Sequence, residues 1–268
     1  MKTIERIILL LAAIVTIIVG LSTIANWPSI KCWLSKCQSD NPAPVISTCT
    51  DNQCSTNQAI ELKKQYEVGD IIKFGSYPSY ENGGEKAIEW EILEKYNDGT
   101  ALVISKYALD NVSYNETYTN MTWETSSIRK WLNNDFYNKA FRNADKSLIV
   151  ESYVVNKNNA KYYTTGGNNT YDKMFLLSID EAKKYFSSDE KMRLLPTPYA
   201  KGSNSKNGKL WTNADYGGSC WWWLRSPGYF QNLAADVDSD GYVNSSGNDV
   251  LNVRGAVRVA FKINLNNL

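Results

Sequence analysis

The C-terminal part of the chain is framed by two apolar runs that each carry arginine. It opens with Trp221-Trp222-Trp223-Leu224-Arg225-Ser226-Pro227-Gly228 and closes with Arg254-Gly255-Ala256-Val257-Arg258. Three consecutive tryptophans carry too much apolar surface to remain in water, so we expect them to anchor a core or a groove. Because side chains alternate across a strand, Trp221 and Trp223 should point one way and Trp222 the other, with one side buried and the other at the edge of a groove.

The segment between these runs has a different composition. Residues 229–254 contain no Lys, Glu, Met or Trp and are rich in Asn, Asp, Ser, Gly and Tyr. A stiff apolar frame around such an insert is typical of a binding surface, because small polar residues adapt their hydrogen bonds while tyrosine supplies contact area at low entropic cost. The predicted ligand-contacting residues are Trp222, Tyr229, Phe230, Asn232, Asp236, Asp238, Asp240, Tyr242, Asn244, Asn248, Asp249 and Asn252.

This insert should fold into hairpins. Residues 234–239 and 242–244 flank Asp240-Gly241, a strong two-residue turn signal, and residues 246–248 offer a second reversal. Alternation along the strand would place Asp236, Asp238 and Asp240 on one face, where neighbouring carboxylates favour a cation or a hydrogen-bonding ligand. Their spacing imitates an EF-hand loop, but the position of the bidentate glutamate holds Gly247. We expect an exposed polar hairpin without a cofactor; a calcium site through these carboxylates and Asn244 is the alternative.

Several motifs together resemble a bacterial domain family of unknown function that looks related to the C-type-lectin-like fold. The resemblance covers roughly residues 68–265. The motifs that carry it are Gly69-Asp70-Ile71-Ile72-Lys73-Phe74-Gly75-Ser76-Tyr77-Pro78, Ile88-Glu89-Trp90, Trp123-Glu124-Thr125, Arg129-Lys130-Trp131-Leu132-Asn133, Phe175-Leu176-Leu177-Ser178, Trp222-Trp223-Leu224-Arg225-Ser226-Pro227-Gly228, Ala234-Ala235-Asp236-Val237-Asp238-Ser239-Asp240-Gly241 and Gly255-Ala256-Val257-Arg258-Val259-Ala260.

The resemblance implies a fold and a kind of surface. The fold would be α+β, a C-type-lectin-like domain of antiparallel sheets and hairpins with two or more helices. Some members of the group resemble target proteins of diversity-generating retroelements, in which Asn-rich template positions are mutagenised at adenines. Such codons cannot produce Lys, Glu, Met or Trp, which residues 229–254 lack.

The upstream sequence predicts strands first and helices afterwards. Residues 70–74, 88–94 and 101–105 are β-rich runs separated by Asn- and Gly-containing turns. Apolar residues with helical spacing over 128–136 follow possible caps at Thr125 or Ser126. A capping box that starts at Ser178 predicts a helix to about residue 186, directly after a buried strand at 174–177. Residues 196–218 should form a long loop.

The N-terminal sequence predicts a membrane anchor and a stalk. Residues 7–25 are uncharged and apolar, which favours a membrane-spanning helix over a cleaved signal peptide. Cys32, Cys37, Cys49 and Cys54 form two CxxxxC pairs, for which disulfides on the extracytoplasmic side are preferred to zinc or free thiols. Cys220 should be buried beside the tryptophans. The expected organisation is an anchor at residues 1–27, a stalk at 28–67 and the lectin-like domain at 68–268.

Charge and composition exclude several classes of function. The 29 basic and 28 acidic residues give a net charge of +1, so we expect no nucleic-acid partner. The sequence has no histidine, which excludes an ordinary Ser-His-Asp or Cys-His arrangement. The prediction is a membrane-tethered, extracytoplasmic module that binds a protein or a glycan. The alternatives are an envelope enzyme that acts on carbohydrate through Asp236 and Asp238, and a passive surface domain. Arg225 and Arg258 are expected to form structural ion pairs rather than to contact the ligand.

Overall fold

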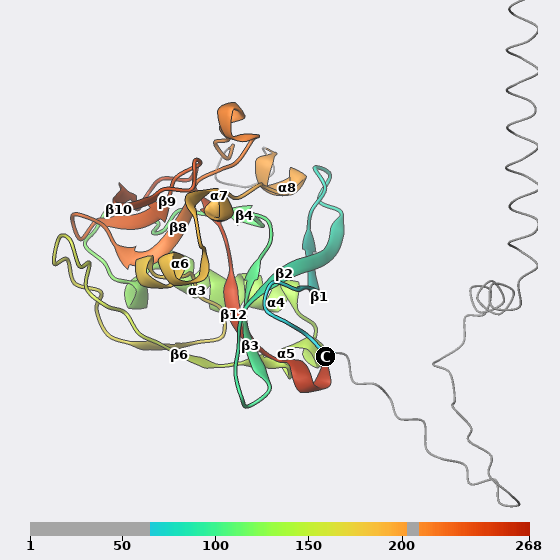
Figure 1. Cartoon of the computed structure of the whole chain (residues 1–268). Coiled ribbons are helices and arrows are strands. Elements are labelled where there is room, and N and C mark those ends of the chain that lie inside the picture. Colours follow the sequence, from blue (N-terminus) through green and yellow to red (C-terminus); the bar gives the residue numbers. More distant parts are fainter. Residues whose placement is uncertain (1–64, 203–208) are drawn as a thin grey trace, which may run out of the picture. The chain divides into compact units, whose positions relative to one another are not determined.

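A computed structural model describes residues 65–202 and 209–268 (Figure 1). Residues Gln65–Leu268 make up one compact unit. Its described part is a mixed α+β fold in which two five-stranded sheets and a two-stranded ribbon are joined by short helices. The predicted α+β class is therefore confirmed.

The first sheet joins the two ends of this unit. Its strand order is β1-β2-β3-β12-β5, and all its pairings are antiparallel. Its strands are β1 (Ile71–Pro78), β2 (Glu85–Lys95), β3 (Thr100–Ser105), β5 (Ile149–Val150) and β12 (Ala260–Asn264). Strand β3 is buried along its whole length, as its continuous apolar run requires. The three predicted N-terminal strands are confirmed, with ends that differ by a few residues.

The second sheet carries the two framing runs. Its order is β10-β9-β8-β11-β4, and its strands are β4 (Asp110–Asn111), β8 (Trp222–Pro227), β9 (Leu233–Val237), β10 (Val243–Asp249) and β11 (Ala256–Val257). Ala256 of β11 pairs in parallel with Trp222 of β8. The opening and closing runs are therefore direct neighbours, and the polar insert leaves the core and returns to it at one place. The β8, β9 and β10 strands lie at the opposite side of the domain from β1 and β2 (Figure 1).

A two-stranded ribbon and short helices complete the described part. The ribbon consists of β6 (Ser152–Val154) and β7 (Thr170–Asp172). The helical segments are η1 (Trp123–Thr125), α3 (Ser127–Trp131), η2 (Leu132–Phe136), α4 (Tyr137–Ala140), α5 (Asn143–Lys146), α6 (Ile179–Tyr185), α7 (Asp189–Met192), α8 (Pro198–Lys201), η3 (Ala214–Tyr216) and η4 (Leu265–Asn267). The predicted caps are present, because the Ser126 hydroxyl accepts from the Arg129 amide and Ser178 forms a capping box with Glu181.

Two predicted elements differ from the structure. Residues 174–177 are buried but do not form a strand; only Phe175 makes an isolated bridge, to Ala260. The neighbouring carbonyls of Leu176 and Leu177 accept instead from the guanidinium and the backbone amide of Arg225. The predicted long loop at 196–218 contains α8 and η3 within its described residues. An apolar run or a polar run alone does not reveal where the backbone hydrogen bonds go.

Large aromatic side chains hold the core together. Trp90, Trp123, Trp222 and Trp223 are each at most 1% exposed. Their indole N–H groups donate to the Phe74 carbonyl, the Asp172 carboxylate, the Met192 carbonyl and the Val112 carbonyl, respectively. Buried tryptophan is stable only when this donor is satisfied, so these bonds fix the orientation of each ring.

The predicted anchor at residues 1–27 lies outside the described residues. So do the cysteines Cys32, Cys37, Cys49 and Cys54 and all but the end of the predicted stalk at 28–67. Among the described residues, no helix combines the length and apolar character needed to cross a bilayer.

Candidate ligand-binding surface

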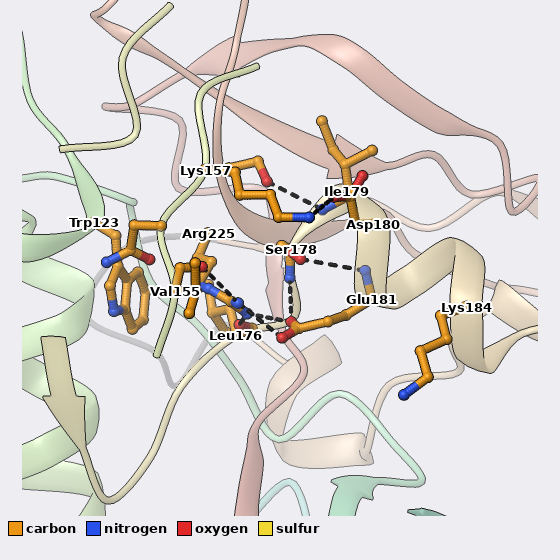
Figure 2. A network of polar contacts seen from close by, with 12 residues as sticks. Trp123, Val155, Lys157, Leu176, Ser178, Ile179, Asp180, Glu181, Lys184 and Arg225 are labelled. Carbon is orange, nitrogen blue, oxygen red and sulfur yellow. Dashed lines mark hydrogen bonds and ion pairs between the residues drawn. The ribbon is translucent and has the colours of Figure 1, made fainter. Parts of the chain in front are cut away.

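The frame of the polar insert depends on an ion pair between the buried Arg225 on β8 and the partly exposed Glu181 on α6 (Figure 2). Both terminal nitrogens of Arg225 donate to the Glu181 carboxylate, and the distance from Nη2 to Oε1 is 2.8 Å. They also donate to the carbonyls of Leu176, at 2.7 Å, and Val155, at 3.2 Å. Burial raises the pKa of Glu181, but the Arg225 charge together with the hydrogen bonds from Arg225 and Ser178 outweighs this and leaves the pKa below its usual value. The predicted structural role of Arg225 is confirmed.

The second arginine supports the closing run in a similar way. Arg258 is 3% exposed, its Nε donates to the Ser105 carbonyl at 3.1 Å, and its Nη2 lies 4.0 Å from the Glu91 carboxylate. Its guanidinium also lies over the rings of Phe186 and Trp222, at 4.7 and 5.1 Å from their centroids. Arg258 thus makes the predicted structural ion pair and a cation–π contact in addition.

The tryptophan triplet is buried on both sides of β8. Trp221 and Trp223 point the same way, with ring centroids 4.7 Å apart, as alternation predicts. Trp222 points the other way and packs against Phe186. The prediction that Trp222 lies at a groove edge and contacts ligand is wrong, because its ring is fully buried and its N–H is used by the Met192 carbonyl. The prediction for Cys220 is confirmed: the thiol is buried, and burial raises its pKa to about 12.

The predicted hairpin is formed by β9 and β10. In the turn, the Asp238 amide donates to the Tyr242 carbonyl at 2.8 Å, and Gly241 has a φ of +96°. The second reversal predicted at residues 246–248 is wrong, because β10 continues to Asp249 through a bulge between Asn244 and Asn248. Gly247 permits the bulge: its φ is +79°, and a Cβ there would meet the Ala234 carbonyl oxygen at 2.3 Å.

Asp236 belongs to the interior of this hairpin. Its carboxylate is fully buried and accepts from the side-chain amides of Asn244, at 3.1 Å, and Asn248, at 3.2 Å. Burial raises the pKa of Asp236 to about 8, and the nearby Asp238 carboxylate adds to this rise. The prediction that Asp236 contacts a ligand at the surface is therefore wrong; it holds the bulge of β10 in place.

The other carboxylates of the row remain accessible. Partial burial raises the pKa of Asp238, and the charge of Asp240 raises it further. The charge of Asp238 thus raises the pKa of Asp236, and the charge of Asp240 raises the pKa of Asp238, as their spacing implies. No group of three or more His, Cys, Asp or Glu side chains is arranged around a common point in the part of the chain that the structure describes.

The remaining predicted contact residues reach the surface. Tyr229, Phe230 and Tyr242 are 48%, 59% and 59% exposed. The partly or fully exposed polar members of the predicted set are Asn232, Asp238, Asp240, Asn244, Asn248, Asp249 and Asn252. The insert therefore presents rings and amides outward from a frame whose own aromatic rings are buried.

The structure adds a loop that the sequence analysis did not assign to this surface. Residues 156–169, between β6 and β7, lie against the start of the insert, where the Tyr162 and Tyr229 ring centroids are 4.7 Å apart. The signal was present in the sequence, because this loop is rich in Asn, Gly and Tyr, as residues 229–254 are, although it also contains Thr and Lys. The sequence analysis did not connect the loop with the insert because the two segments are far apart along the chain.

A pocket of about 240 Å³ lies elsewhere, between the β1–β2 hairpin and residues 196–198. Its lining includes Tyr80, Tyr107, Pro196 and a single carboxylate, Glu89, which pairs with Lys106 at 2.9 Å. This pocket does not provide the two facing carboxylates that carbohydrate hydrolysis requires.

A protein-family model matches residues 98–265. The chain belongs to the DUF6273 family, a domain of unknown function. The DUF6273 match contains both framing runs and the β9–β10 hairpin, whereas β1 and β2 precede it although they belong to the same sheet as β3. Neither the curated proteins nor the solved structures contain a match to this chain. The expected membership in a domain family of unknown function is therefore confirmed.

Proposed function

We propose that this protein is an extracytoplasmic ligand-recognition module, held at the membrane by residues 7–25, that binds a protein or a glycan through the exposed part of residues 229–252. One observation carries the proposal: Tyr229, Phe230 and Tyr242 stay exposed on an insert whose two ends are fixed in the core. Large exposed rings on a rigid support are costly in water and typical of recognition surfaces.

The burial pattern divides the predicted residues into two roles. Trp222 and Asp236 belong to the support, because their side chains are enclosed. The contact surface consists of the remaining residues of the predicted set, Tyr229, Phe230, Asn232, Asp238, Asp240, Tyr242, Asn244, Asn248, Asp249 and Asn252. The proposal needs no metal or organic cofactor, because amides, carboxylates and rings suffice for recognition.

The finer proposal is that the domain is C-type-lectin-like and that its insert is diversified. Two arrangements support it: short helices accompany small, mostly antiparallel sheets, and the segment without Lys, Glu, Met and Trp coincides with the insert. The gene neighbourhood tests this part. A reverse transcriptase beside a near-copy of the 3′ end of the gene is the expected finding, and an unrelated neighbourhood without such a copy would contradict diversification.

The binding proposal is tested with the combined variant Phe230→Ser, Tyr242→Ser and Asp249→Asn in the full-length chain. Binding is measured on an array of defined glycans and on envelope proteins of the cells that produce the chain. We expect binding to be lost while Tm falls by no more than about 2 °C, because none of these side chains is buried. Tyr80→Ser is the matched control, because this ring is 53% exposed and belongs to the turn between β1 and β2, the strands opposite to β8, β9 and β10. Unchanged binding in the combined variant, or a collapse of Tm, would contradict the proposal.

The alternative, a carbohydrate-active envelope enzyme, has one observation in its favour. The pKa of about 8 for Asp236 beside the more accessible Asp238 is the kind of asymmetry that separates a general acid from a base. Complete burial of Asp236 leaves it without access to a glycosidic bond, so the binding function is the better supported of the two. Hydrolysis of defined oligosaccharides that is lost in Asp238→Asn would favour the enzyme.

A further inference from the structure

The loop between β6 and β7 is attached to the C-terminal insert by one buried side chain. Asn159 is 2% exposed, and its Nδ2 donates to the carbonyls of Pro227 and Ser245, both at 2.8 Å. Its Oδ1 accepts from the amides of Lys161, at 3.0 Å, and Tyr162, at 3.3 Å. A single amide thus joins β8, the bulge of β10 and the tip of the loop, which lies beside them in Figure 1.

Further hydrogen bonds fix the loop near its tip and at its base. The Thr164 hydroxyl donates to the Tyr229 carbonyl at 3.0 Å, and the Gln231 side chain donates to the Thr165 carbonyl at 3.0 Å. At the base, the buried Asn156 donates from Nδ2 to the Asn168 carbonyl at 2.8 Å. These hydrogen bonds favour the described conformation of the loop without a ligand, which would reduce the entropic cost of binding.

The anchored loop completes a cluster of exposed rings. Tyr162 meets Tyr229 edge to face at 4.7 Å, and Tyr229 meets Phe230 at 4.3 Å with the rings inclined by 69°. Lys161 lies over the Tyr162 ring, and Tyr242, which follows the turn between β9 and β10, is a further exposed ring of the insert. We call Tyr162, Tyr163, Tyr229, Phe230 and Tyr242 the aromatic surface.

Tyr163 forms the tip of this surface. Its side chain is 84% exposed, and its backbone has a φ of 60°, the only left-handed conformation of a non-glycine residue among the described residues. The position is held by two bonds, from the Tyr163 amide to the Asn159 carbonyl at 2.8 Å and from the Asn159 amide to the Thr164 carbonyl at 2.9 Å. Glycine or asparagine would adopt this conformation at lower cost, so a solvent-exposed tyrosine here has no structural benefit.

We propose that the loop of residues 156–169 and the C-terminal insert form one continuous binding surface, and that its ligand is a folded protein with a concave, largely apolar face that receives Tyr163. This inference rests on the proposed function and names the ligand class. The protruding tip fits a recess in a partner. Rigid tyrosines surrounded by short Asn, Ser, Thr and Gly side chains are the composition of surfaces that recognise proteins.

A glycan fits these contacts less well. A sugar ring stacks on an open aromatic face, whereas Tyr162, Tyr229 and Phe230 lie edge to face and partly cover one another. The inclined rings give an uneven surface, between whose projections the side chains of a protein can pack. The exposed cation of the loop tip, Lys161, lies over the Tyr162 ring at 5.0 Å and can reach a carboxylate at the rim of the partner.

The contact is tested by site-specific photo-cross-linking in the full-length chain, in the cells that produce it. The probe is p-benzoylphenylalanine in place of Tyr163, of Phe230 and, as a control, of Tyr80. We expect the same discrete protein adduct from Tyr163 and Phe230 and none from Tyr80. The adduct is identified by mass spectrometry, and the identified protein is then purified for measurement of Kd with the full-length chain. The absence of a protein adduct at Tyr163, or an equal adduct at Tyr80, would overturn the inference.

The decisive variant separates binding from folding. Tyr163→Asn should weaken Kd by about tenfold or more, while Tm stays constant or rises by about 2 °C because asparagine tolerates the left-handed backbone. Asn159→Ala should weaken Kd with a local loss of protection against hydrogen exchange in residues 156–169. Unchanged Kd for Tyr163→Asn would overturn the inference. Binding of the full-length chain to an array of defined glycans, lost in Tyr163→Asn, would also overturn it.

The two proposals fail in different ways. If the combined variant of Phe230, Tyr242 and Asp249 loses the partner while Tyr163→Asn retains it, the insert binds alone and only the loop inference falls. If Tyr163→Asn loses the partner while the combined variant retains it, the loop binds alone, and both the proposed role of the insert and the continuity of the surface fall.

Discussion

The frame and the aromatic surface both rely on aromatic residues but use them in opposite ways. In the frame, Trp222 and Trp223 are fully buried and their N–H groups are bound to backbone carbonyls. In the aromatic surface, Phe230 and Tyr163 remain more than half exposed. Hydrogen bonds and arginine pairs fix the first region, so that the second can expose rings without altering the fold. Stability and recognition should therefore respond to different substitutions.

The largest effect on stability is expected for Trp222→Ala. Removing the buried indole leaves a cavity between Phe186 and the Arg258 guanidinium, which should lower the free energy of unfolding by about 3–5 kcal/mol. Urea denaturation followed by tryptophan fluorescence measures this loss. A loss below about 1 kcal/mol would show that Trp222 is not part of the support.

The ion pair in Figure 2 provides the next comparison. Glu181→Gln leaves the Arg225 charge buried without a carboxylate, which should cost about 3 kcal/mol in the free energy of unfolding. The matched control is Lys157→Gln, which removes the exposed pair with Asp180 from the same view and should cost less than about 0.5 kcal/mol. Equal effects in urea denaturation would contradict the assignment of Arg225 to the frame.

Asp236 lies between the two regions and should make stability depend on pH. Its pKa is raised to about 8 in the folded chain, so the folded state keeps a proton that the unfolded state releases at about pH 4. Stability should therefore fall as the pH rises from about 4 to about 8, because the ionised carboxylate is disfavoured in the fold.

Asp236→Asn tests this dependence. The amide has nearly the same shape and no charge, so the variant should be more stable than the parent chain at pH 8 and about equally stable at pH 4. Urea denaturation at both pH values measures the difference. A parent chain whose stability does not fall between these values would contradict the raised pKa.

Local sequence signals predicted the elements but not the way they meet. The capping box at Ser178 and the turn at Asp240-Gly241 depend on neighbouring residues, and both are present. The alternation of Trp221 and Trp223 is also a local property of a strand. The α+β class followed from such elements and from the family resemblance.

Contacts between distant segments were beyond sequence reasoning. The parallel pairing of β8 with β11, the bulge of β10 and the anchoring of the β6–β7 loop by Asn159 each depend on partners far along the chain. Asp236 shows the consequence for the site: alternation placed it correctly in a row of carboxylates, but only its amide neighbours Asn244 and Asn248 explain its burial. Trp222 was misplaced because periodicity separates two faces without showing that both are covered.

The smallest effect on stability is expected at the aromatic surface. Phe230→Ser removes a ring that is 59% exposed and contacts Tyr229, so the free energy of unfolding should change by less than about 0.5 kcal/mol. The same substitution should nevertheless weaken ligand binding more than Tyr80→Ser does, since Tyr80 is similarly exposed but belongs to the turn between β1 and β2. Urea denaturation and Kd measured on the same preparations separate the two quantities. A marked loss of stability in Phe230→Ser would show that the Phe230 ring belongs to the frame. The proposed separation of a stabilising frame from a binding surface would then be wrong for this part of the insert.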